Sequence, residues 1–294
     1  MTAELERTIP PPHPDPHAPR TFTPPPGACD AHCHIFGPAA RFPFSDDRAY
    51  TPPDSGLEDF ERLQERLGLS RAVFVQASCH GLDNAAMVDA LRRGKGRYAG
   101  VAMVDESFTD AQLAELHEAG VRGTRFNFVA HLGGAPEMDE FWRIVERVAK
   151  FDWHVVLHFD AKDLPQYAAM LDAMPVPYLI DHMARVDASK GLEQEPFQYL
   201  LELLKDERAW VKISGAERIT KDGVPPYDDV VPYVQALIAA APERTLWGTD
   251  WPHPNVRAVP DDGDLVDLLT SFAPDEEARN RILVENPTRL YDFS

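Results

Sequence analysis

Histidine and aspartate side chains recur where short apolar runs of this sequence end. His32 and His34 form an HxH pair in the first run, His158 and His182 lie at the ends of the fifth and sixth runs, and Asp250 follows the eighth run. Alternate residues of a β-strand point to the same face, so we expect both imidazoles of the HxH pair to face one interior. Collected at one place, these five groups would form a site for acid–base or metal chemistry.

The same five residues are a plausible ligand set for one divalent metal ion. Imidazole nitrogens and a carboxylate suit Zn²⁺ and leave room for a bound water. A functional site without metal is the alternative, because a carboxylate beside several imidazoles can deprotonate water and polarise a carbonyl. Both readings indicate hydrolysis of an ester, lactone or amide, with either no cofactor or a single divalent metal, for which zinc is the favoured ion.

Covalent catalysis is disfavoured by the sequence. No GxSxG motif is present, and Cys33 lies between two inward-facing histidines, so its thiol should point outward into the barrel wall.

Two arginines could bind an anionic substrate. Arg125 ends the fourth apolar run, where its positive charge opposes a second cation, and Arg218 follows the seventh run. Guanidinium groups grip carboxylates through paired hydrogen bonds. Tyr50 and Ser78 could add further hydrogen bonds to the substrate.

Eight short apolar runs alternate with amphipathic segments. The runs cover residues 28–36, 72–77, 98–104, 123–128, 154–159, 178–183, 210–214 and 245–249. Helices are predicted over residues 57–67, 84–93, 110–119, 139–151, 164–173, 196–205, 228–241 and 261–272. This alternation predicts an α/β fold, a (β/α)8 TIM-type barrel with its chemistry at the carboxyl ends of the strands. An open doubly wound sheet is the weaker alternative, because no run is followed by a GxGxxG or Walker-type loop.

Composition limits the partners and the compartment. The 294 residues carry a formal net charge of −19, which argues against nucleic acid and anionic membranes as partners. The three cysteines are too few for a disulfide scaffold, and neither a secretory signal nor a long apolar run is present, so we expect a cytoplasmic protein. Residues 1–26 form a proline-rich N-terminal arm, disordered or draped over the surface, and residues 27–294 a single hydrolase domain.

Several segments carry a family resemblance, among them TPPPGACDAHCHIFGP, QASCHG, GTRFNF, LIDHM and LWGTDWPHPN. They resemble the amidohydrolase superfamily and, within it, the 2-pyrone-4,6-dicarboxylate lactonases of bacterial protocatechuate and lignin-derived aromatic breakdown. The resemblance covers nearly all of the chain after the arm. It implies a distorted (β/α)8 barrel that hydrolyses a cyclic ester.

The resemblance also implies roles for individual residues. Asp250 corresponds to the general base that activates water, and His32, His34 and His182 to the groups around the lactone carbonyl. The positions that match substrate-binding residues are Tyr50, Ser78, Arg125 and Arg218, with His253 and Asn255 in the closing motif as further candidates.

Two positions depart from the lactonase pattern. His158 stands where the family has a tyrosine, and Val129, Ala130 and His131 stand where it has a second arginine. Lactonases of this type work without a divalent metal, whereas His158 restores the fifth-strand ligand of metal-dependent relatives. His158 is therefore a candidate both for substrate binding and for a metal site.

The leading prediction is a lactone hydrolase that opens 2-pyrone-4,6-dicarboxylate, or a close dicarboxylated lactone, to an open-chain oxalomesaconate-type acid. The alternative is a zinc-dependent hydrolase or decarboxylase of a related lactone or aromatic-derived acid, and a weaker third reading is a non-catalytic binder of an anionic metabolite. The predicted partner is a small anionic dicarboxylate lactone, with no nucleic acid and no membrane. Assembly into a homo-oligomer is left open.

Overall fold

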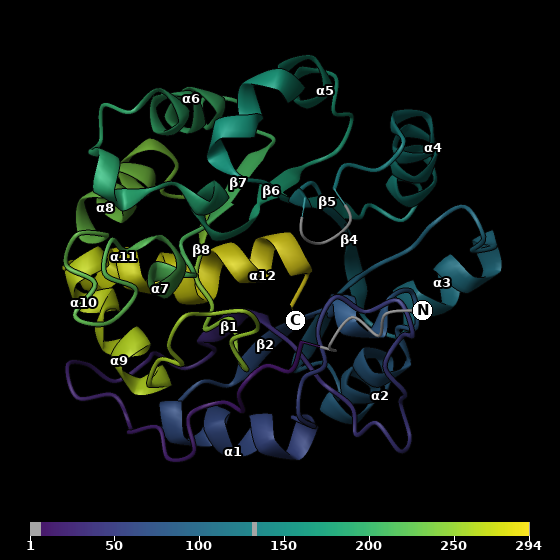
Figure 1. Ribbon diagram of the computed structural model, residues 1–294, viewed down its shortest axis with the longest axis horizontal. Coiled ribbons are helices and arrows are strands. Elements are labelled where there is room, and N and C mark those ends of the chain that lie inside the picture. Colours follow the sequence, from purple (N-terminus) through teal and green to yellow (C-terminus); the bar gives the residue numbers. More distant parts are fainter. Residues whose placement is uncertain (1–6, 131–133, 294) are drawn as a thin grey trace.

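The computed structural model describes residues 7–130 and 134–293, and His131 lies outside them. Eight parallel strands follow one another around a barrel in chain order (Figure 1). The strands are β1 (Cys29–Cys33), β2 (Arg71–Val75), β3 (Tyr98–Ala102), β4 (Val121–Asn127), β5 (His154–His158), β6 (Tyr178–Ile180), β7 (Ala209–Lys212) and β8 (Thr245–Leu246). The predicted (β/α)8 barrel is confirmed. Each strand begins within two residues of the first residue of a predicted apolar run.

Backbone hydrogen bonds join the last strand to the first. The amide of Ala31 donates to Trp247 O at 2.9 Å, and the amide of Asp250 donates to His32 O at 2.8 Å. Gly248 permits this approach, because a Cβ at that position would lie 2.4 Å from the backbone nitrogen of His32. The closure therefore brings the HxH pair and Asp250, which are more than 200 residues apart in the chain, to one place.

Helices surround the strands. They are α1 (Leu57–Leu67), α2 (Ala85–Gly94), α3 (Asp110–Glu118), α4 (Met138–Ala149), α5 (Ala168–Asp172), α6 (Glu195–Leu203), α7 (Ala216–Ile219), α8 (Val231–Ala240), α9 (Asp262–Asp267), α10 (Leu269–Phe272), α11 (Glu276–Asn280) and α12 (Asn286–Tyr291). The helix predicted over 164–173 begins as a 3₁₀ segment, Ala161–Tyr167, which contains Pro165. Proline lacks the amide that an α-helical turn requires, so the α-helix starts only after it.

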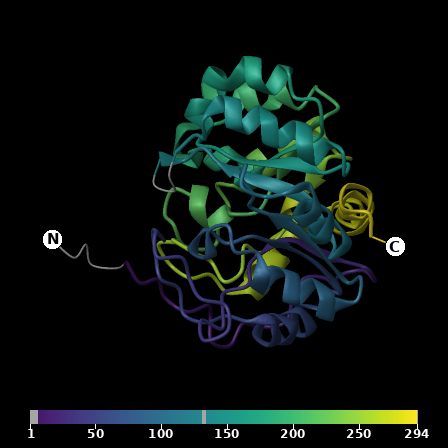
Figure 2. The same ribbon diagram turned by 90° about the vertical axis from the view of Figure 1, so that its right-hand side faces the viewer.

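The apolar core has two layers. Inside the barrel lie small and branched side chains such as Ala31, Val73 and Val101, whereas Cys33 packs outward with the helices. Tyr291 and Phe293 at the end of α12 belong to the inner layer. Figure 2 shows α12 beside the barrel next to the C-terminus, where it covers the end opposite the carboxyl ends of the strands.

The described part of the proline-rich arm crosses the outer helices. Asp15 pairs with Arg66 of α1 at 2.8 Å, and the His17 ring bonds Asp264 of α9 at 2.7 Å. The Arg279 guanidinium of α11 lies 5.2 Å from the centre of the Phe22 ring. From residue 7 onward, apart from residues 131–133 and 294, the structure has no helix long and apolar enough to cross a membrane.

Candidate active site

A pocket opens at the carboxyl ends of the strands. It is narrow in this structure, with a cavity volume of about 30 Å³. The residues that line it are His34, Tyr50, Ser78, Arg125, His158, His182, Arg185, Arg218, Asp250, Pro254 and Asn255. Nine of the eleven candidate residues from the sequence are among them; His32 lies beneath the pocket, and His253 faces away from it.

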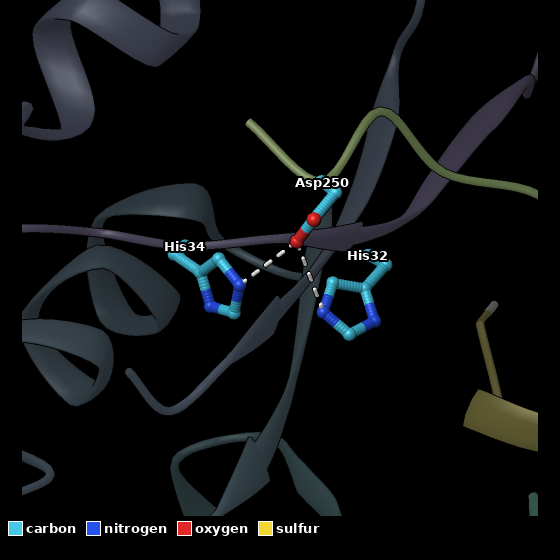
Figure 3. Close-up of side chains that lie close together, drawn as sticks. All are labelled: His32, His34 and Asp250. Carbon is cyan, nitrogen blue, oxygen red and sulfur yellow. Dashed lines mark hydrogen bonds and ion pairs between the residues drawn. The ribbon is translucent and has the colours of Figure 1, made fainter. Parts of the chain in front are cut away.

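The HxH pair and Asp250 lie close together (Figure 3), and His34 and Asp250 line the pocket. Oδ1 of Asp250 lies 3.1 Å from Nε2 of His34 and 3.5 Å from Nε2 of His32. Nε2 of His182 approaches the same oxygen at 3.9 Å. Three imidazoles from β1 and the segment after β6 therefore converge on one carboxylate oxygen.

The other oxygen of Asp250 is held by Arg218 on α7. Nε of Arg218 donates to Oδ2 at 2.7 Å, and Nη2 of Arg218 contacts the same oxygen. Burial opposes ionisation of this carboxyl, but Arg218, His182 and the bond from His34 outweigh it and hold the pKa of Asp250 well below its usual range. Asp250 is therefore ionised at neutral pH and can accept a proton. Arg218, which we expected to bind substrate, is engaged mainly with Asp250.

His34 is oriented by the backbone of β2. Its Nδ1 lies 2.8 Å from Val75 O, an acceptor, so Nδ1 carries a proton. Nε2 then faces Oδ1 of Asp250 at 3.1 Å, so a proton taken up by the carboxylate can lie between these two atoms. This contact can therefore store a proton during a reaction.

His32 is oriented by two buried residues that the sequence reasoning missed. Its Nδ1 lies 2.9 Å from Nζ of Lys212 on β7 and 3.3 Å from Oδ1 of Asp181, which follows β6. Lys212 and Asp181 are themselves 3.1 Å apart, and none of the three is exposed. Burial and the Lys212 charge hold the pKa of His32 well below its usual range. A charged residue inside the apolar run 210–214 was the available signal for Lys212.

His182 sits in a stretch of left-handed backbone. Residues 182–185 have φ values between 48° and 54°, which turns the chain inward directly after β6. Nδ1 of His182 bonds Oγ of Ser214 at 2.9 Å. Burial lowers the pKa of His182 to about 3, so this imidazole is neutral at physiological pH.

Arg125 and His158 contact each other across β4 and β5. Nε of Arg125 donates to Oδ2 of Asp181 at 3.0 Å, and Nη2 of Arg125 lies 3.0 Å from Nδ1 of His158. A guanidinium is only a donor, so His158 accepts through Nδ1 and carries its proton on Nε2. Burial, followed by the charge of Arg125, holds the pKa of His158 well below its usual range.

The remaining candidates lie at the rim or outside it. Oγ of Ser78 lies 3.5 Å from Oη of Tyr50, and both line the pocket with Asn255. His253 bonds Asp262 of α9 at 2.9 Å and is fully buried. It therefore joins the loop after β8 to an outer helix.

The buried histidines and aspartates lie close enough to hold a metal ion. Among the described residues, donor atoms of His32, His34 and Asp250 fall within 4.8 Å of one another, whereas His158 joins no such group. His34 has a lone pair available at Nε2, but Lys212 donates to Nδ1 of His32, which leaves the proton of that ring on Nε2. The positions of the donor atoms therefore fit a metal ion. The proton on Nε2 of His32 does not, because a metal ligand needs a lone pair there.

Charge in and around the pocket is nearly balanced. Four cationic side chains, those of Arg125, Arg185, Lys212 and Arg218, face four carboxyl groups, those of Asp160, Asp181, Glu217 and Asp250. Arg185, which the sequence reasoning also missed, bonds Asp160 at 3.0 Å and is one-third exposed. This count leaves no surplus positive charge, so an anionic ligand is met by the individual arginines that line the pocket.

Comparisons with known proteins find a matching family and similar proteins. The family model described as amidohydrolase matches residues 29–293. The chain is 46% identical over 279 residues to 2-pyrone-4,6-dicarboxylate hydrolase of Comamonas testosteroni, covering 92% of each chain. It is 42% identical to 4-sulfomuconolactone hydrolase of Hydrogenophaga intermedia, covering 93% of this chain and 91% of the relative.

A solved structure from Pseudomonas putida, whose name suggests a 2-pyrone-4,6-dicarboxylic acid hydrolase, superposes with a TM-score of 0.82. Its sequence is 31% identical, and the match covers 91% of this chain and 98% of that one.

Proposed function

Since the chain belongs to the amidohydrolase family, as the sequence resemblance indicated, we propose that it hydrolyses a small anionic lactone, with 2-pyrone-4,6-dicarboxylate as the leading substrate. The names of the two curated relatives support ring opening of an anionic lactone. The observation that carries the proposal is an ionised Asp250 that faces three imidazoles at the floor of a pocket lined by arginines.

Attack on the lactone begins with a water molecule beside Oδ1 of Asp250. The carboxylate takes one proton from this water, and the new C–O bond forms at the ring carbonyl carbon. Arg218 holds Oδ2, so Asp250 presents Oδ1 to the water. The carbonyl oxygen gains negative charge, and the N–H of a neutral imidazole can donate a hydrogen bond to it.

Ring opening returns the proton. The bond between the carbonyl carbon and the ring oxygen breaks, and the leaving oxygen receives the proton that Asp250 accepted. The contact between His34 and Asp250 can carry this proton for the life of the tetrahedral intermediate. Water and lactone are consumed, and an open-chain acid is released with no net change in the enzyme.

Arg125 supplies the recognition of a substrate carboxylate. Its Nε and Nη2 are bonded to Asp181 and His158, which fixes the plane of the guanidinium. Arg125 is among the residues that line the pocket. A fixed, charged donor of this kind suits an anionic substituent on the lactone ring.

The proposal is tested with purified protein and 2-pyrone-4,6-dicarboxylate, followed by ultraviolet absorbance. We expect turnover by the wild type and a roughly 10²- to 10⁴-fold lower kcat for Asp250→Asn. Asp172→Asn, a change of the same type at the exposed end of α5, serves as the control and should keep wild-type activity. Absence of turnover by the wild type, or full turnover by Asp250→Asn, would contradict the proposal.

A zinc-dependent hydrolase or decarboxylase is the second candidate, favoured by the approach of His32, His34 and Asp250. Zinc bound there would lower the pKa of a water and polarise the carbonyl. Metal analysis of the same preparation separates the two candidates. One equivalent of metal whose removal abolishes activity supports the zinc enzyme, and full activity after chelation supports the metal-free one.

A further inference from the structure

A buried triangle of side chains lies beneath the pocket, and two of its members, Lys212 and Asp181, take no part in the proton transfers of the proposed reaction. It consists of Nδ1 of His32, Nζ of Lys212 and Oδ1 of Asp181, separated by 2.9, 3.1 and 3.3 Å. All three side chains are completely buried. Burying a lysine costs free energy unless its ammonium is paired, so this arrangement calls for an explanation.

The ion pair at this triangle is rigid. Oδ2 of Asp181 accepts from Nε of Arg125 at 3.0 Å, which leaves Oδ1 toward Lys212 and His32. Lys212 and Arg125 outweigh the effect of burial and hold the pKa of Asp181 well below its usual range. Asp181 is thus a fixed anion that keeps the ammonium of Lys212 against the ring of His32.

Lys212 and Asp181 make opposite demands on Nδ1 of His32. The ammonium has only donors, so its contact at 2.9 Å needs a lone pair on Nδ1. The carboxylate has only acceptors, so its contact at 3.3 Å would need a proton there. The lysine contact is shorter and has hydrogen-bond geometry, which decides the position of the proton.

We propose that Lys212 is a positioning residue that fixes His32 as the tautomer protonated on Nε2. Nε2 of His32 is buried and has no hydrogen-bond partner among the described residues, and it lies 3.5 Å from Oδ1 of Asp250. In this tautomer it presents an N–H beside the carboxylate that activates water. That N–H donates to the lactone carbonyl oxygen as negative charge develops, a role that rests on the proposed function.

The same tautomer removes His32 from the metal-ligand set. An imidazole binds a metal through a lone pair, and here the nitrogen that faces Asp250 carries hydrogen. Without Lys212, Asp181 would draw the proton to Nδ1 and leave the lone pair of Nε2 toward Asp250 and His34. Lys212 therefore decides whether these side chains form a hydrogen-bond donor site or a metal site.

The experiment compares wild-type protein with Lys212→Met, which keeps the length of the side chain and removes the ammonium. Nitrogen NMR of ¹⁵N-histidine-labelled, ligand-free protein reports which ring nitrogen of His32 carries hydrogen, with the His32 signals assigned from His32→Gln. We expect Nε2–H in the wild type and Nδ1–H in Lys212→Met. Lys205→Met, a surface change after α6, is the matched control and should leave the His32 signals unchanged.

Two further measurements separate positioning from a general structural role. Lys212→Met should lose roughly 10²- to 10³-fold in kcat with little change in KM, as when one donor to an oxyanion is removed. Titration with zinc should show tighter binding to Lys212→Met than to the wild type. If Lys212→Met does not fold, the wild-type spectrum alone still decides the tautomer.

Nδ1–H on His32 of the wild type would overturn this inference, as would an unchanged tautomer in folded Lys212→Met. Failure of the wild type to open any lactone would contradict the proposed function instead, because the NMR measurement uses no substrate.

Discussion

Arg125 is the residue best placed to distinguish anionic from neutral lactones. Two of its nitrogens are bonded to Asp181 and His158, so it meets the substrate in a fixed orientation. Replacing it with methionine removes a charged hydrogen bond that is worth about 1.5–3 kcal/mol. We expect Arg125→Met to raise KM for a dicarboxylated lactone by roughly 10- to 100-fold and to change KM for a neutral lactone much less.

Steady-state kinetics with the two lactones measures this difference. Arg122→Met, at the opposite end of the same strand, is the matched control and should leave both KM values unchanged. Equal effects of Arg125→Met on both lactones would show that Arg125 supports the site and does not recognise charge.

Sequence patterns located the side chains that converge at the pocket better than the residues that orient them. Histidines and an aspartate at the ends of apolar runs pointed to the floor of the pocket, because the carboxyl ends of barrel strands meet there. Lys212 interrupts an apolar run in the same way, but its role depends on contacts with β1 and β6 that spacing along the chain does not show. Arg218 was expected at the substrate, and only the fold reveals that Asp250 engages it.

At the scale of elements, periodicity predicted the strands and the long helices, and failed for short ones. The helix α1 matches its prediction at both ends, because a clear apolar stripe ends at Gly68 in the left-handed conformation. The four-residue helix α7, which carries Arg218, is too short to show a helical period. The segment predicted as one helix over 261–272 divides into α9 and α10 at Leu268.

The contact between the β8 loop and α9 should make stability depend on pH. Burial lowers the pKa of His253, but Asp262 at 2.9 Å outweighs it and raises the pKa above the ordinary value of about 6.5. A group whose pKa is raised on folding contributes its full stabilisation at pH values below its pKa in the unfolded state. This contribution disappears as the pH rises through its pKa in the folded state. We expect the free energy of unfolding to fall from pH 6.5 upward, and less steeply in His253→Gln.

Urea unfolding at several pH values between 6 and 9 measures this dependence. His117→Gln is the control, because burial lowers the pKa of His117 and its contribution therefore changes only below pH 6.5. Parallel curves for the wild type and His253→Gln above pH 6.5 would show that the pair with Asp262 is not charged.

At the scale of the whole molecule, the chain is strongly acidic, whereas the charged groups of the pocket are balanced. The chain carries a formal net charge of −19, and in and around the pocket four cations face four carboxyl groups. The attraction between the pocket and an anionic substrate is therefore weaker than the pocket arginines alone would produce. It acts over a few ångströms, between groups that are mostly buried, and salt screens such interactions little.

The surface charge should instead govern how an anionic substrate approaches. At about 0.01 M salt the screening length is roughly 30 Å, so much of the acidic surface repels a dianion, and at about 0.1 M the length is roughly 10 Å. We expect kcat/KM for a dicarboxylated lactone to rise roughly two- to tenfold over this range, provided that association limits the rate, and kcat/KM for a neutral lactone to stay constant. Kinetics in a series of sodium chloride concentrations measures both. A fall for the dicarboxylate would show that the pocket arginines dominate the field at a distance, and Arg185, the most exposed of them, would then be the first residue to replace.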